Sequence, residues 1–215
     1  MQVRGFPVGP IQENTYLAWV EGSDRAIIVD PGEEAPRLLQ EIEKEGLTLD
    51  AILFTHTHFD HVGAVAPIAK ATGAPVYVPE LERHVLADIM SFVPFDGFGP
   101  YESWEAEETV AGGETLSLAG LDIEVVFTPG HSPGHVTYAV TGAGATGLFS
   151  GDVLFEGSVG RVDLPGGDWP TLERSIGTLL ARYDDETPVF PGHMGITTLG
   201  RERATNPFLG ELTGR

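Results

Sequence analysis

The stretch AILFTHTHFDHVG, at positions 51–63, decides the fold class of this sequence and carries more than half of its candidate metal ligands. Its first four residues are apolar and predict a buried strand of a central sheet. Four possible ligands follow within six residues: His56, His58, Asp60 and His61. An extended segment points positions 56 and 58 to the same side, so both imidazoles can reach one ion. The next two ligands start a predicted helix over residues 60–72 and could face a second ion beside the first.

The alternative interpretation of this segment is a polar loop after a strand, with His58 and His61 as incidental surface residues. The chain has only seven histidines, and three of them stand within these six positions. Such clustering favours a metal site over incidental polarity.

Three more candidate ligands each follow a predicted strand. They are His131 in FTPGHSPGH, Asp152 in LFSGDVLF and His193 in VFPGHMG. Sites built from loops at strand ends are typical of layered α/β folds. The alternation of strands and helices along residues 2–90 predicts the same fold class.

The pattern H-x-H-x-D-H, followed at a distance by H, D and H, strongly resembles the metallo-β-lactamase superfamily. Within it, the context resembles the glyoxalase II (hydroxyacylglutathione hydrolase) branch. Residues 160–166 (GRVDLPG) and 197–203 (TTLGRER) are similar to the short bacterial members of that branch. The resemblance covers almost the whole chain, and it implies an αβ/βα four-layer sandwich.

The resemblance also implies how the ligands divide between two divalent ions. One ion would be held by His56, His58 and His131. The second would be held by Asp60, His61 and His193. Asp152 would bridge the two, because a carboxylate has two oxygens and an imidazole cannot span two ions. Zinc is expected, and these nitrogen and oxygen ligands would also accept iron or manganese.

Two adjacent ions generate a hydroxide at neutral pH, which predicts a hydrolase acting on a carbonyl. A thiol can leave as a thiolate without a general acid, whereas an amide nitrogen needs a proton. Asp60 is the one obvious proton donor and the candidate catalytic residue. The prediction is therefore hydrolysis of a thioester, similar to a hydroxyacylglutathione, or of a related ester.

One alternative is an oxidoreductase. Persulfide dioxygenases resemble this motif and use a single iron at the positions of His56, His131 and Asp152. A true β-lactamase is disfavoured, because the bridging position in those enzymes is not Asp.

Arg161 is the candidate substrate-binding residue. Glyoxalase II enzymes place a basic residue here, where it contacts glutathione. The sequence departs from their pattern nearby, with Asp163 at an aromatic position and Gly195 at a tyrosine position. The alternative role for Arg161 is an ion pair with Asp163 or Asp168 that holds the loop.

Composition bounds the other possibilities. The 215 residues predict one domain over positions 1–215, and the lack of cysteine excludes disulfides and thiolate ligands. No apolar run approaches about 20 residues and the first residues do not begin a signal peptide, so a cytoplasmic protein is expected.

The formal net charge of −20 disfavours nucleic acid and anionic membranes as partners. A small-molecule thioester or ester is the expected partner, and a homo-oligomer stays possible.

The rest of the chain gives expectations for individual elements. A helix is predicted over residues 79–90, and an antiparallel pair over 109–118 and 121–128 that turns at Ala119-Gly120. Between them, residues 91–106 hold five aromatic side chains among prolines and glycines. We expect this aromatic loop to line the pocket or a subunit contact rather than to cap the core. Asp30 is either a buried support for the metal loop or a turn cap, and His135 is expected to be a supporting or packing residue rather than a ligand.

Overall fold

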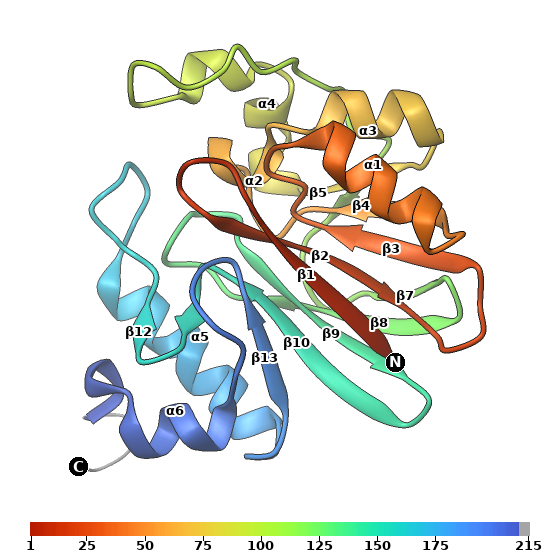
Figure 1. Cartoon of the computed structure of the whole chain (residues 1–215). Helices are drawn as coiled ribbons and strands as arrows, with labels where there is room; N and C mark the ends of the chain where they lie inside the picture. The colour runs from red at the N-terminus through yellow and green to blue at the C-terminus, as the bar shows by residue number, and fades with distance from the viewer. Residues whose placement is uncertain (211–215) are drawn as a thin grey trace.

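Two six-stranded sheets stack face to face in the computed structural model, which describes residues 1–210 (Figure 1). The first sheet has the order β1 (Gln2–Val8), β2 (Glu13–Trp19), β3 (Arg25–Val29), β4 (Thr48–Leu53), β5 (Val76–Pro79) and β6 (Glu108–Val110). The second has the order β14 (Thr197–Thr198), β13 (Pro188–Pro191), β10 (Ala145–Gly151), β9 (Val136–Gly142), β8 (Leu121–Phe127) and β7 (Thr115–Leu118). A small hairpin, β11 (Leu154–Phe155) and β12 (Ser158–Val159), follows β10.

Helices cover the outer face of each sheet. On the first sheet lie α1 (Ala35–Lys44) and α3 (Val65–Thr72), and on the second lies α5 (Trp169–Arg182), with α6 (Leu199–Thr205) beside it (Figure 1). The remaining short helices are α2 (Phe59–Val62), η1 (Glu80–Glu82), α4 (Arg83–Leu86), η2 (Ile89–Phe92) and η3 (Pro207–Leu209).

Three apolar layers separate these four layers of structure. In β3, Ile28 packs under the helices while Ile27 faces the second sheet, as the twofold alternation of a strand requires. In α5, Leu172 and Ile176 pack on the outer face of the second sheet. Because both sheets are covered on both faces, their inner strands are apolar throughout. The predicted α/β class and αβ/βα four-layer sandwich are confirmed.

The topology brings four strand ends to one edge. β8 and β10 both pair antiparallel with β9, and β13 runs parallel to β10, so the carboxyl ends of β8, β10 and β13 meet. The first sheet joins this edge directly, because the amide of Val136 donates to the carbonyl of Thr55 and the Tyr138 hydroxyl donates to the carbonyl of Phe54. All four loops predicted to carry ligands therefore start at the same place.

One predicted strand needs correction. The predicted strand over residues 109–118 is split between the sheets: β6 pairs parallel with β5, and β7 pairs antiparallel with β8. Gly112 and Gly113, at φ of 103° and 96°, turn the chain from one sheet to the other. The predicted turn at Ala119-Gly120 does join β7 to β8, with both residues at positive φ.

The predicted helices over residues 60–72 and 79–90 are interrupted. The first is divided into α2 and α3 because the amide of Ala64 donates to the carbonyl of Pro31, outside the helix. The second becomes η1, α4 and η2, since the amide of Ile89 bonds to the Ser103 hydroxyl. In both places, a partner distant in the sequence replaces the helical hydrogen bond.

Candidate metal centre

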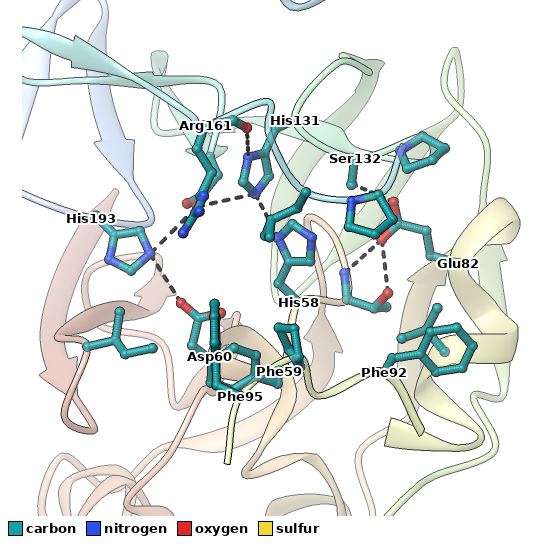
Figure 2. Close-up of a pocket in the computed structure, with 18 of the residues that line it drawn as sticks. His58, Phe59, Asp60, Glu82, Phe92, Phe95, His131, Ser132, Arg161 and His193 are labelled. Atoms are coloured by element: carbon teal, nitrogen blue, oxygen red, sulfur yellow. Dashed lines mark hydrogen bonds and ion pairs between the residues drawn. The ribbon is translucent and has the colours of Figure 1, made fainter. Parts of the chain in front are cut away.

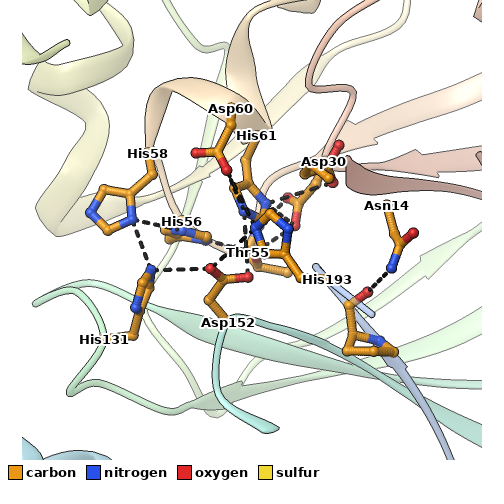
Figure 3. A network of polar contacts seen from close by, with 12 residues as sticks. Asn14, Asp30, Thr55, His56, His58, Asp60, His61, His131, Asp152 and His193 are labelled. Carbon is orange, nitrogen blue, oxygen red and sulfur yellow. Dashed lines mark hydrogen bonds and ion pairs between the residues drawn. The ribbon is translucent and has the colours of Figure 1, made fainter. Parts of the chain in front are cut away.

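All seven predicted ligands lie together at the shared edge of the two sheets (Figure 3). The first cluster is His56, His58 and His131. His58 Nδ1 lies 3.1 Å from His56 Nε2 and 2.8 Å from His131 Nε2. Three imidazole nitrogens thus converge on one point, as a three-histidine site requires.

The second cluster contains Asp60, His61 and His193. Asp60 Oδ2 is 3.3 Å from His193 Nε2 and 3.9 Å from His61 Nε2. Ligands at about 2.1 Å from a tetrahedral ion lie about 3.4 Å from one another, so these separations fit one ion.

Asp152 lies between the two clusters (Figure 3). Its Oδ1 is 3.4 Å from His61 Nε2, and its Oδ2 is 3.4 Å from His131 Nε2 and 3.6 Å from His193 Nε2. Asp152 Oδ1 and His61 Nε2 are buried without a hydrogen-bond partner among the described residues. Buried polar atoms are rarely left so, and a bound cation would satisfy both.

Gly192 makes this close approach possible. A Cβ at this position would lie 2.3 Å from Asp152 Oδ1 and 2.7 Å from the His61 ring. Position 192 therefore has to be glycine, because any side chain there would push Asp152 and His61 away from the site. The donor set and the backbone around it both fit the two metal ions that the sequence predicts.

Hydrogen bonds behind the histidines fix their tautomers. Thr55 Oγ1 donates to Asp30 Oδ2 at 2.6 Å, so it can only accept from His56 Nδ1, 3.1 Å away. Nδ1 of His56 then carries the proton, and Nε2 presents its lone pair to the first cluster. His61 Nδ1 donates to Asp30 Oδ2 at 3.1 Å in the same way. Asp30 is therefore the buried support for the metal loop, the first of its two predicted roles.

His131 is oriented by the main chain. Its Nδ1 donates to the carbonyl oxygen of Arg161 at 2.7 Å, which leaves Nε2 free to bind a metal. His135 is buried, and its Nε2 accepts from the amide of Asp152 at 3.1 Å. It supports the loop that carries Asp152, as expected, and contributes no ligand to either cluster.

Glu82 is a functional residue that the sequence analysis did not identify. It is 5% exposed, and its carboxylate accepts hydrogen bonds from the amides of Thr57 and Gly134, each at 2.8 Å. It also accepts from the Thr57 and Ser132 hydroxyls. Glu82 therefore joins the loop of His56 and His58 to the loop of His131.

The electrostatics of the two clusters differ. Burial, reinforced by neighbouring histidines, lowers the pKa of His56 well below its usual value and that of His58 to about 4. Burial also disfavours the cationic forms of His61 and His193, but the carboxylates of Asp152 and Asp60 together outweigh it and raise the pKa of both. Burial would raise the pKa of Asp152, but attraction from His61, His193 and His131 holds it far below its usual value.

A pocket of about 800 Å³ opens onto both clusters (Figure 2). Arg161 lines it, and its guanidinium binds Asp163 through two hydrogen bonds, Nε to Oδ1 at 2.6 Å and Nη2 to Oδ2 at 2.7 Å. Of the two predicted roles for Arg161, the pair with Asp163 is therefore present, while substrate binding stays a prediction.

The aromatic loop has two parts. Phe92 and Phe95 are about half exposed and line the pocket, as expected. Tyr101 and Trp104 instead pack against the buried core between the first sheet and its covering helices. His84, at the pocket edge, lies against the Phe92 ring.

Residues 8–193 match the family described as the metallo-beta-lactamase superfamily. The chain belongs to this superfamily of metallo-hydrolases. It is 40% identical to "Probable metallo-hydrolase YqgX" of Bacillus subtilis (strain 168) over 97% of this chain and 98% of the relative. It is 37% identical to "Hydroxyacylglutathione hydrolase GloC" of Haemophilus influenzae over the same shares. These relatives support the predicted resemblance to the glyoxalase II branch.

Solved structures extend the comparison. The "BLEG-1 B3 metallo-beta-lactamase" structure superposes with a TM-score of 0.90 at 38% identity, covering 97% of this chain and 99% of that one. "TTHA1623 in a di-iron-bound form" superposes with a TM-score of 0.76 at 42% identity, covering 96% and 100%. Among residues 1–210, no helix is long and apolar enough to span a membrane.

Proposed function

We propose that this chain is a dinuclear metal-dependent hydrolase that cleaves thioesters. The observation that carries the proposal is the placement of Asp152, whose two oxygens lie 3.4 Å from ligands of different clusters. A single ion at His56, His131 and Asp152 would use one of these oxygens and would leave the second cluster without an ion. When bound, two divalent ions would supply Lewis acidity, lowering the pKa of water and polarising a carbonyl oxygen.

The protein's own residues prepare the site for such chemistry. The bonds of Thr55 to His56, of Asp30 to His61 and of the Arg161 carbonyl to His131 hold three imidazoles with Nε2 toward the other candidate ligands. Asp60 lies in the pocket wall with Oδ2 toward His193 and the second cluster, so a proton that Asp60 transfers would be held by its other carboxylate oxygen.

The pocket favours a leaving group that needs no proton. Its carboxylates are Asp60, Glu82 and Asp152, and Glu82 is fully engaged with the two loops. Burial would raise the pKa of Asp60, but His61 and His193 outweigh it and lower that pKa, so Asp60 is a weak general acid near neutral pH. A thiolate can leave unassisted, which supports thioesters over amides and lactams. The relative described as a hydroxyacylglutathione hydrolase supports the same reaction class.

The persulfide dioxygenase alternative needs only His56, His131 and Asp152. Those enzymes keep the other motif residues without a second ion, so the number of ions bound at Asp60, His61 and His193 distinguishes the two functions. The neighbour titled a B3 metallo-beta-lactamase makes a cephalosporin a necessary comparison substrate.

Thiol release from a thioester by the metal-loaded protein tests the proposal. We expect thioester turnover to exceed both cephalosporin hydrolysis and oxygen uptake with a persulfide. Asp152→Ala removes a candidate ligand of both ions, so it is expected to lower kcat/KM by more than about a hundredfold, and by more than His61→Ala. Asp185→Asn breaks an exposed ion pair with Arg203 far from the site and serves as the control. Equal losses in both site variants with unchanged metal content would contradict the bridging role.

A further inference from the structure

Much of the pocket wall outside the metal ligands is apolar. Five exposed side chains contribute to it: Ile11 before β2, Leu81 in η1, Phe92 at the end of η2, Phe95 after it and Met194 after β13. Their exposed fractions lie between 39% and 59%. Water-exposed apolar groups that surround one opening are characteristic of a surface that binds an apolar ligand.

Few lysine or arginine side chains line this pocket. Among the described residues that line it, Arg161 is the only lysine or arginine. Both oxygens of the Asp163 carboxylate bind that guanidinium. An anionic ligand that approached Arg161 would therefore also approach Asp163, in a chain whose formal net charge is −20.

We propose that the pocket selects thioesters with apolar, uncharged substituents, and that Asp163 masks Arg161 against anionic ones. This inference rests on the proposed function, and it names the substrate class of the same site. A glutathione thioester, as a net anion with polar arms, would meet a hydrophobic wall and a neutralised cation. An uncharged thioester with an alkyl arm could place that arm on Phe92 and Met194.

Phe92 provides the test of the apolar wall. In wild type, lengthening the acyl chain or the thiol-side alkyl chain of an N-acetylcysteamine-type thioester by several methylenes should raise kcat/KM by at least about tenfold. Phe92→Ser should remove most of that gain. Phe208→Ser is the matched control, because Phe208 is 49% exposed against 48% for Phe92 and does not line the pocket. No gain on either side in wild type, or equal effects of both variants, would overturn the proposal.

Asp163 provides the test of masking. The measured quantity is the ratio of kcat/KM for a glutathione thioester to that for an uncharged thioester with the same acyl group. Asp163→Asn should raise this ratio by at least about threefold at low ionic strength and less in high salt. Asp185→Asn, which breaks an equivalent exposed Asp–Arg pair elsewhere, should leave the ratio unchanged. A smaller rise, or the same rise in the control, would overturn the masking role.

Binding separates failure of this inference from failure of the proposed function. Calorimetry with non-hydrolysable thioethers, one alkyl and uncharged and one S-alkyl glutathione, needs no turnover. Tighter binding of the uncharged thioether, lost in Phe92→Ser, would support the inference even if no thioester is cleaved. Tighter binding of the glutathione thioether by wild type would overturn it.

Discussion

His61 and His193 lie beside two carboxylates, whereas His56 and His58 lie among other histidines. The pKa of the first pair is raised and that of the second pair is lowered. A metal ion binds only the neutral imidazole. An ion that binds the second cluster must therefore displace protons from His61 and His193. An ion that binds the first cluster finds His56 and His58 already neutral.

We expect the ion at the second cluster to be lost first as the pH falls from about 7 to about 5, because proton competition there begins at higher pH. Metal content measured after equilibration at stepped pH values should fall in two steps. His193→Gln removes a ligand of the second cluster, so this variant should show only the step at lower pH. Loss of both ions in one step would contradict the difference between the clusters.

At the scale of elements, η1 holds two loops of the site together through one side chain. Glu82 reaches the amide of Thr57, 25 positions earlier, and that of Gly134, 52 positions later. Its removal would leave buried donors on both loops without a partner.

Glu82→Ala is expected to lower the free energy of unfolding of the metal-free protein by about 3 kcal/mol, the cost of unsatisfied buried donors to a charged acceptor. Denaturant unfolding measures this directly. Glu80→Ala changes an exposed glutamate of the same short helix and should cost less than about 0.5 kcal/mol. Equal costs would show that Glu82 does not hold the loops.

Glu82, in η1, also shows which features of the site could not be predicted from the sequence. The gathering of the seven candidate ligands could be predicted, because four of them are clustered in the sequence and the family resemblance supplied His131, Asp152 and His193. Glu82 could not, because nothing near it in the sequence indicates that its partners lie in two distant loops. The interruptions of the helices at Ala64 and Ile89 likewise depend on Pro31 and Ser103, which only the fold brings close. Local alternation also could not reveal that β6 and β7 belong to different sheets.

At the scale of the whole molecule, the site joins the two halves of the sandwich. The first sheet supplies the loop of His56 to His61, and the second supplies His131, Asp152 and His193. Apolar layers on both faces of each sheet keep these strand ends in place, so two ligand clusters can be preformed at one edge. Whether the protein forms a homo-oligomer stays a prediction.

Metal stoichiometry tests the central claim most directly, because two clusters joined by Asp152 predict two ions per chain. Elemental analysis should be made on protein prepared without chelator and equilibrated with zinc, iron or manganese. The expected result is about two transition-metal ions per chain, falling to about one in His193→Gln. A single tightly bound iron, with no second ion taken up at added metal, would contradict the dinuclear hydrolase.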